Sequence, residues 1–284
     1  MKNKNTFIIL SILCFMLFSL NAVETGFSSY FGTYGLTDYE NSNTEYSAFF
    51  QWGANIYYKD TSGIDDALGY KLELDVDPLL KYRLKSEIKF SHPFYSISFG
   101  PVFGLINQSK TLVKPGFSGN LRTEAPGWGF IDIGGELVPF RSSLLKEDYS
   151  TYSGFYSIGF YLKRDHILCY FTQKNDLYSE INGNDESSAS RTSYMFYTDY
   201  YEKNSILKIQ SKLGYEKQDL ILAGETSIEI KNILMGLRFD FSINGSTVYL
   251  GLDNRLYPVS SGSLELKDVP GYLFTFSTGF ILYK

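Results

Sequence analysis

Residues 68–90 read LGYKLELDVDPLLKYRLKSEIKF, and two alternating runs in this stretch decide the fold. In the first run, 68–76, every second residue is apolar and charges stand between them; the second, 82–90, repeats the pattern with one serine among its apolar positions. A period of two is that of a β-strand, whose successive side chains point to opposite faces. The segment 77–81 contains Pro78, so the stretch predicts two strands joined by a short loop.

The charges fix the register of this hairpin. With Val76 opposite Tyr82, three pairs of opposite charge face each other, and each pair contributes about 0.2–1 kcal/mol. A shorter loop, 77–79, would instead place Lys71 opposite Lys85. The predicted pairs are Asp75 with Arg83, Glu73 with Lys85, and Lys71 with Glu87. We therefore expect neighbouring strands to form antiparallel hairpins.

The same alternation recurs almost to the end of the 284 residues, and it predicts an all-β chain of about 14 strands, or 12 if two weak segments are loops. No long segment has the helical spacing of apolar residues. The clear segments are 46–58, 68–76, 82–90, 95–105, 152–162, 233–243 and 272–282, and the weaker ones are 26–36, 127–138, 167–178, 193–201, 206–215, 220–230 and 247–256.

Two further hairpins are predicted from possible turns. A turn at Lys231-Asn232 places Glu225 opposite Arg238. A turn at Asn244-Gly245, the dipeptide favoured in type I′ hairpins, places Phe241 opposite Val248 and Phe239 opposite Leu250. The chain is therefore expected to run as a meander.

The two faces of these strands distinguish a soluble protein from a membrane barrel. One face is bulky and apolar, whereas the other carries glycines and charges. In a soluble barrel or sandwich the apolar face packs a core; in a transmembrane antiparallel up-and-down β-barrel it meets lipid, and the small or charged face lines the lumen. Segment lengths near the ~9–11 residues that cross a bilayer favour the transmembrane barrel. So do aromatics near strand ends, namely Tyr46, Tyr57, Tyr58, Phe94, Tyr95, Tyr194, Tyr201, Tyr272 and Tyr283. A secreted soluble β-protein is the alternative.

The N-terminal 1–22 predict a secretory signal peptide, which leaves 23–284 as the barrel domain. Two lysines precede the apolar run Phe7–Phe18, and small and polar residues follow up to Ala22. The alternative, a membrane anchor helix, needs about 20 apolar residues, and this run is shorter. If Cys14 leaves with the signal, Cys169 remains alone and no internal disulfide can form.

With these features in place, the chain resembles bacterial outer-membrane β-barrel proteins of a porin-like kind. The resemblance rests on the signal peptide, the aromatic alternating strands, the short hairpins and the final strand with Tyr272, Phe274 and Phe276. It covers 23–284, is architectural, and carries over no family residues. The chain ends in Lys284 after Tyr283, whereas such barrels usually end in an aromatic residue. The resemblance implies a place in the bacterial outer membrane, in contact with its lipid.

Catalytic and metal-binding patterns are weak. His92 and His166, the two histidines, fall in predicted turns, and no G-x-S-x-G pattern is present. Residues 182–186, NGNDE, lack the ligand spacing of a calcium loop. We expect no enzyme, no cofactor and no metal, and the net charge of −5 argues against a nucleic-acid partner.

The predicted lumen is the candidate functional site. Rings of charge inside a barrel can select ions and solutes, so the chain is predicted to be a channel for passive diffusion of small hydrophilic solutes or ions, with weak selectivity because both signs are present. The simpler interpretation is that the pairs only hold strands in register, and a plugged structural or surface-binding barrel is the alternative function. The candidate lumen-lining residues are Lys71, Glu73, Asp75, Arg83, Lys85, Glu87, Arg238 and Asp240.

The lengths of some predicted loops conflict with the predicted strand count. The segments 107–126 and 257–270 are predicted to be outer loops. The same strand count places 139–149 and 180–190 on the periplasmic side, where turns should be short. This conflict points to a miscounted strand between 139 and 201.

Overall fold

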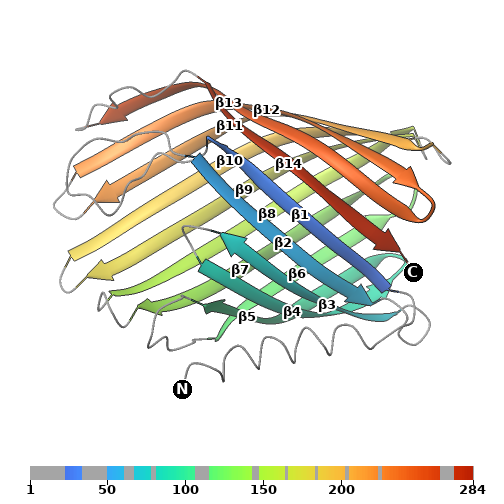
Figure 1. Cartoon of the computed structure of the whole chain (residues 1–284), viewed down its shortest axis with the longest axis horizontal. Helices are drawn as coiled ribbons and strands as arrows, with labels where there is room; N and C mark the ends of the chain where they lie inside the picture. Colours follow the sequence, from blue (N-terminus) through green and yellow to red (C-terminus); the bar gives the residue numbers. More distant parts are fainter. Residues whose placement is uncertain are drawn as a thin grey trace.

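The computed structural model describes residues 23–33, 50–60, 67–77, 81–105, 115–142, 147–163, 166–182, 185–201, 205–222, 226–262 and 272–283. These residues form one closed antiparallel barrel of 14 strands (Figure 1). The strands are β1 (Val23–Thr33), β2 (Phe50–Asp60), β3 (Leu68–Asp77), β4 (Lys81–His92), β5 (Tyr95–Leu105), β6 (Pro115–Ala125), β7 (Gly129–Ser142), β8 (Glu147–Lys163), β9 (Ile167–Asn182), β10 (Asp185–Tyr201), β11 (Leu207–Leu222), β12 (Thr226–Ile243), β13 (Ser246–Gly262) and β14 (Tyr272–Tyr283). The predicted fold class is confirmed.

Each strand pairs with the next along the chain, and β14 returns to pair with β1. This seam runs from Glu24 opposite Tyr283 to Gly32 opposite Thr275. An even number of antiparallel strands brings the start of β1 and the end of β14 to the same end of the barrel, where the turns after β4, β6 and β12 also lie. The predicted signal peptide, 1–22, lies outside the described residues. Among the residues described, no helix is long and apolar enough to cross a membrane.

The β3–β4 hairpin has the predicted register. Val76 pairs with Tyr82, and the three charge pairs expected from the sequence all face each other. The turn between β12 and β13 is also confirmed, because Phe241 pairs with Val248 and Phe239 with Leu250. The turn residues Asn244 and Gly245 have φ angles of 48° and 75°, the left-handed values that a type I′ turn requires.

Two errors in the predicted strand list cancel in the total. Strand β6 occupies 115–125, within the segment predicted as an outer loop. Conversely, the predicted strands 206–215, 220–230 and 233–243 are only two strands, β11 and β12. The predicted turn at Lys231-Asn232 is wrong, because both residues lie inside strand β12 and pair with residues of β11. Its expected partner Glu225 lies outside the described residues, and Arg238 faces Gln210 and Gly251.

The added strand β6 resolves the conflict over loop length, but it lies at 115–125, so the prediction of a miscounted strand between 139 and 201 is wrong. Strand β6 reverses the direction of every strand from β7 to β10, so the connections after β7 and β9 lie at the end opposite the termini. Most of 139–149 and 180–190 is strand rather than loop. Of the second predicted outer loop, 257–262 belongs to β13, and 263–271 is not described.

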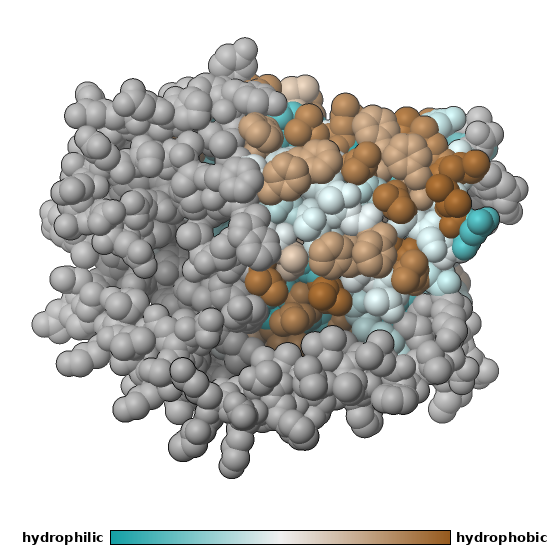
Figure 2. Space-filling model, in the orientation of Figure 1, coloured by the Kyte–Doolittle hydropathy of each residue, from teal (hydrophilic) through white to brown (hydrophobic). Residues whose placement is uncertain are grey.

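The outer surface is apolar. Phe117, Ile133 and Phe160 are 57%, 54% and 59% exposed, although each lies within a barrel strand. On the face formed by β14, β1 and β2, brown apolar side chains lie in rows separated by paler residues (Figures 1 and 2). A soluble barrel would bury these side chains, so this exterior suits lipid.

Polar and aromatic side chains mark the limits of this apolar surface. Near the end that carries the termini, the turn residues Phe94 and Trp128 are exposed. On β11 and β12, Tyr215 and Ile233 still face outward, but two residues further on Lys217 and Lys231 occupy the same face. Lys217 bonds Asp219 at 3.1 Å and Glu229 at 2.8 Å, so the outer face becomes charged there. Aromatic belts and outer charges at the edges are typical of a barrel in a membrane.

Candidate functional site

The charged side chains lie on the inner face of the barrel. Arg83 of β4 bonds Glu136 of β7 at 2.6 Å, although two strands, β5 and β6, separate them. Such a contact is possible only across the concave side of a closed sheet. By the alternation of strand residues, all eight candidate side chains lie on this inner face.

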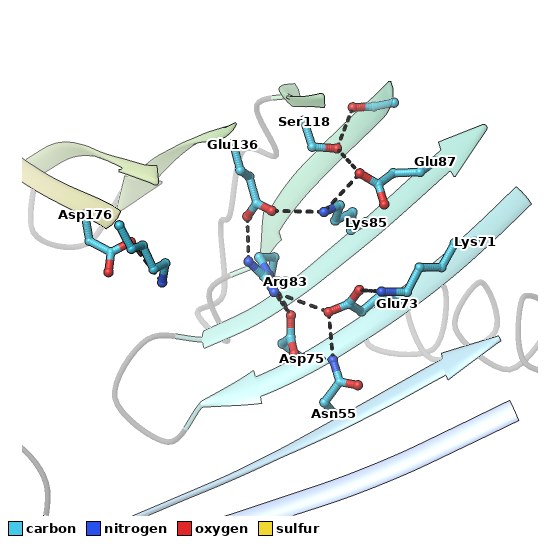
Figure 3. A network of polar contacts seen from close by, with 12 residues as sticks. Asn55, Lys71, Glu73, Asp75, Arg83, Lys85, Glu87, Ser118, Glu136 and Asp176 are labelled. Carbon is cyan, nitrogen blue, oxygen red and sulfur yellow. Dashed lines mark hydrogen bonds and ion pairs between the residues drawn. The ribbon is translucent and has the colours of Figure 1, made fainter. Parts of the chain in front are cut away.

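Six of the eight candidates form one cluster, which we call the β3–β7 network (Figure 3). Arg83 is its centre: it bonds Asp75 through both Nε and Nη2, and it also contacts Glu73 at 3.5 Å. Lys85 lies 3.0 Å from Glu87 and 3.5 Å from Glu136. The members of the network are Asn55, Lys71, Glu73, Asp75, Arg83, Lys85, Glu87, Ser118 and Glu136.

Small residues on β5 and β6 make the long reach of Arg83 and Lys85 possible. The inner faces of these strands carry Gly100, Val102 and Gly104 on β5, and Gly116 and Ser118 on β6. Because these side chains are short, Arg83 and Lys85 pass over them to Glu136. Val102 and Ser118 are 0% and 1% exposed beneath this layer. The network is therefore packed against the wall, with Glu87 accepting a hydrogen bond from Ser118.

The other two candidates lie half a circuit away, on the wall formed by β11–β14. Arg238 bonds Asp240 through Nε at 2.6 Å and Nη2 at 3.3 Å, and its guanidinium lies 3.9 Å from the ring centre of Tyr249. Lys212 of β11 bonds Asp253 of β13 at 2.7 Å. This second pair spans Gly236 of β12, which faces both residues in the sheet.

A buried carboxylate lies further along the same wall. Glu216 is 3% exposed and bonds Arg255 through both of its oxygens, at 2.8 and 3.1 Å. Arg191 approaches the same carboxylate at 3.8 Å, and Asn232 donates a hydrogen bond of 3.4 Å to it. Two guanidinium groups around one buried carboxylate compensate the cost of removing its charge from water.

Inward-facing aromatic rings lie flat over glycines of the next strand. A side chain added at Gly26, Gly159 or Gly279 would meet the ring of Tyr57, Phe130 or Tyr249, respectively. Tyr170 and Tyr197 stack on each other at 4.6 Å with an interplanar angle of 6°. Because these rings lie against the wall, they cover it without extending their full length toward the barrel axis.

Many inner charges remain in contact with water even though they are paired. The side chains of Lys174, Lys208 and Asp253 are 48%, 42% and 40% exposed. Every carboxylate on the inner face whose side chain is described lies within 4.0 Å of a lysine or arginine nitrogen. The inner surface is thus both hydrated and close to charge balance.

The histidines lie in turn regions, as predicted. His92 ends β4, where its Nδ1 accepts a hydrogen bond from the Phe94 backbone N–H at 3.4 Å and its ring stacks on Tyr95 at 4.9 Å. His166 immediately precedes β9. Within the described part of the chain, no group of three or more His, Cys, Asp or Glu residues is arranged to hold a metal ion.

Sequence reasoning missed several residues of this inner surface. Ser118 lies on the undetected strand β6, so its face could not be assigned. Glu136 lies in the predicted strand 127–138 and was available from the alternation of Ile133 and Leu137 on the other face. Glu216 follows the point at which the predicted strand 206–215 ended. The inward position of Lys212 could have been predicted, because Ile209, Ser211 and Leu213 alternate with it on the other face. The inward position of Asp253 could have been predicted from the alternation of its own strand.

Comparison with known proteins gives structural likeness without sequence likeness. No family model matches the chain, and no curated protein matches it in sequence. A loop-deletion mutant of OmpT, an outer membrane protein of Vibrio cholerae, is 10% identical and has a TM-score of 0.47, over 92% of this chain and 98% of that one. The outer membrane channel DcaP of Acinetobacter baumannii is 10% identical and has a TM-score of 0.44, over 92% and 96%. An anion-selective porin from Comamonas acidovorans is 7% identical and has a TM-score of 0.40, over 93% and 98%.

These TM-scores are below 0.5, so the likenesses carry no argument about function. The fold is established by the closed strand order and register of the chain itself. The chain is a closed 14-stranded antiparallel barrel with an apolar exterior and a charged interior, and in this architecture it resembles bacterial outer-membrane β-barrel proteins.

Proposed function

We propose that the chain forms a channel for passive diffusion of small hydrophilic solutes or ions across the bacterial outer membrane. The observation that carries this proposal is the hydration of the inner charges: Lys174, Lys208 and Asp253 keep 40–48% of their side-chain surface accessible. A barrel filled by its own side chains would bury them, because lysine and aspartate are costly to desolvate.

The apolar exterior supports a place in the membrane, with outer-membrane lipid as the neighbouring phase. Closure supports it too, since a membrane excludes unpaired strand edges. The eight residues predicted to line the lumen take that role in this proposal. The paired charges favour weak selectivity, because the fields of neighbouring opposite charges largely cancel and salt screens the remainder over a Debye length of about 8 Å.

Single-channel recording in a planar bilayer tests the channel. We expect discrete, steady conductance steps from the purified protein, with a reversal potential close to zero in a salt gradient. Lys217→Glu supplies a matched control, because Lys217 faces outward and its substitution should leave the selectivity unchanged.

The alternative function, a plugged structural or surface-binding barrel, predicts a different result. A protein that inserts into bilayers and resists heat denaturation without conducting would exclude the channel. Failure to float with lipid vesicles would exclude both membrane functions.

A further inference from the structure

Glycines on two neighbouring strands line a niche in the β11–β14 wall. In one row of the inner face, Lys212, Gly236 and Asp253 lie side by side on β11, β12 and β13. In the adjacent row, Arg238 and Gly251 are neighbours on β12 and β13. The row of Arg238 begins with Gln210 on β11 and ends with Ser277 on β14. Each row thus has a glycine where a side chain would otherwise stand.

These two rows line a cavity of about 130 Å³. A single water molecule needs only about 10–15 Å³ on the same measure, so the cavity can hold several waters or a small solute. Its polar lining comes from Gln210, Lys212, Arg238, Asp253 and Ser277. Lys212 and Asp253 are 25% and 40% exposed, so the niche is open to the barrel interior.

Both signs of charge line this niche, and they are not fully used. Lys212 and Asp253 bond each other, and Arg238 bonds Asp240. Among the described residues, Arg238 donates hydrogen bonds through Nε and Nη2 but none through Nη1, and Lys212 bonds Asp253 at Oδ1 while 40% of the Asp253 side chain stays exposed. A donor group and an acceptor oxygen therefore remain available on opposite sides of a small polar cavity.

The charge balance selects the class of ligand. A carboxylate is recognised well by a guanidinium or ammonium group, and an ammonium group by a carboxylate. A ligand with one charge would engage either Lys212 or Asp253 and would leave the other residue of the pair without its opposite charge. A ligand that carries both charges a few ångströms apart satisfies both sides and keeps the niche neutral.

We propose that this niche binds small zwitterions, namely free amino acids. The ligand carboxylate contacts Arg238 and Lys212, and its ammonium group contacts Asp253. The side chain of a larger amino acid extends into the barrel interior, since the niche is open on that side. The inference rests on the proposed function in one respect: the ligand reaches the niche through the lumen.

Binding is tested by calorimetry on the full-length protein in detergent micelles, which requires no conductance. The probes are glycine and alanine, with acetate and methylammonium as ligands that carry one charge each. We expect glycine and alanine to bind with a Kd of about 1 mM, and each singly charged probe to bind at least about tenfold more weakly.

Variants separate the niche from the general charge of the lumen. The double variant Lys212→Gln, Asp253→Asn should weaken glycine binding at least about tenfold. Lys174→Gln, Asp176→Asn is the matched control: it removes another inward lysine–aspartate pair, at 3.1 Å, and should leave binding unchanged. Gly236→Ala leaves every charge in place, but its methyl group meets the ends of Lys212 and Asp253, so it should also abolish binding.

Conductance of the same preparations distinguishes this inference from the proposed function. A conducting protein that binds no glycine, binds acetate as tightly, or loses binding equally in the control variant overturns the zwitterion niche and leaves the channel. A protein that binds glycine as expected but never conducts supports the niche and overturns the channel.

Discussion

The β3–β7 network and the β11–β14 niche use the same chemistry on opposite walls, with different results. Both consist of lysine and arginine paired with aspartate and glutamate on the inner face. In the network, Arg83 crosses two strands of small residues and closes onto Glu136 (Figure 3). In the niche, Lys212 crosses one glycine and leaves a cavity beside it.

Glycine serves opposite purposes in the two walls. A side chain at Gly100 would collide with backbone atoms of Ser86 and Glu87, so this glycine allows β4 and β5 to approach closely. The β4–β5 ladder is also interrupted here, opposite Pro101, which has no N–H to donate. The atoms nearest to a side chain added at Gly236 belong to the flexible side chains of Lys212 and Asp253 and not to backbone. Small residues therefore close one wall and open the other.

The largest effect is expected from adding a methyl group to these two glycines. Gly100→Ala should lower the free energy of unfolding by about 2–3 kcal/mol, because backbone must move. Gly236→Ala should cost less than about 1 kcal/mol, because side chains can turn aside. Urea titration of the protein in lipid vesicles measures both, and equal losses would contradict the difference between the walls.

The next effect concerns the central cations. Arg83→Met leaves Asp75, Glu73 and Glu136 without their shared partner and should cost about 2 kcal/mol, below the cost for a fully buried pair because Arg83 is 34% exposed. Lys212→Met leaves a single carboxylate, Asp253, which is 40% exposed and can be solvated by water, so this change should cost less than about 1 kcal/mol. When the same unfolding assay is repeated at high salt, both variants should lose less free energy of unfolding. If Lys212→Met lost more free energy of unfolding than Arg83→Met, the β11–β14 wall and not the β3–β7 network would be the more tightly packed one.

Ion selectivity should respond in the opposite order. Lys212→Glu places a second carboxylate beside Asp253, which is 40% exposed, and should raise the cation-to-anion permeability ratio by about threefold. Arg83→Met, whose charge is surrounded by carboxylates, should change it less for each unit of charge removed. Reversal potentials in a salt gradient report both ratios. Indifference to Lys212→Glu would place Lys212 off the ion path.

A last prediction concerns the difference in labelling rate between the outer and inner faces of β9. Cys169 shares the outward face with Phe171 and pairs with Phe160, so a charged thiol reagent should label it at least about tenfold more slowly than a membrane-soluble one. Thr172→Cys in a Cys169→Ser background places the thiol on the inner face, where the charged reagent should be faster. Labelling in vesicles measures the rates, and identical preferences at both sites would invalidate the assignment of faces.

The β3–β4 hairpin was predictable to the residue because all of its signals are local. Its strands are adjacent in sequence, and three charge pairs agree on a single register. The Asn244-Gly245 turn was predictable for a similar reason, since a two-residue turn sets the register of both strands. Charge pairing and turn chemistry need no knowledge of distant strands.

Strand β6 escaped prediction because its inner face is adapted to other strands. Its sequence, PGFSGNLRTEA, has the glycine and serine content of a loop. Gly116 and Ser118 are small because side chains of β4 pass over this part of the wall to reach β7. No local pattern reveals this, since the reason lies about thirty residues earlier and twenty later in the sequence.

The division of β11 and β12 failed for another reason. These strands have 16 and 18 residues and continue past the apolar exterior. Beyond that limit Lys217, Asp219, Glu229 and Lys231 face outward, so the alternation of apolar and polar residues loses its meaning. A charged stretch inside a strand then looked like the turn between two strands.

The β1–β14 seam makes the barrel dependent on a single long-range event. Every other neighbouring pair of strands is consecutive in sequence, but Glu24 and Tyr283 meet only when nearly the whole chain has been folded between them. Closing a loop of that length costs about 5 kcal/mol of chain entropy, several times the cost for a tight hairpin. Until β14 (12 residues) arrives, β1 and β13 remain open edges that lipid cannot solvate. The rate of assembly should therefore depend on delivery of these last residues, and a chain shortened there would retain most of its hairpins without becoming a sealed cylinder.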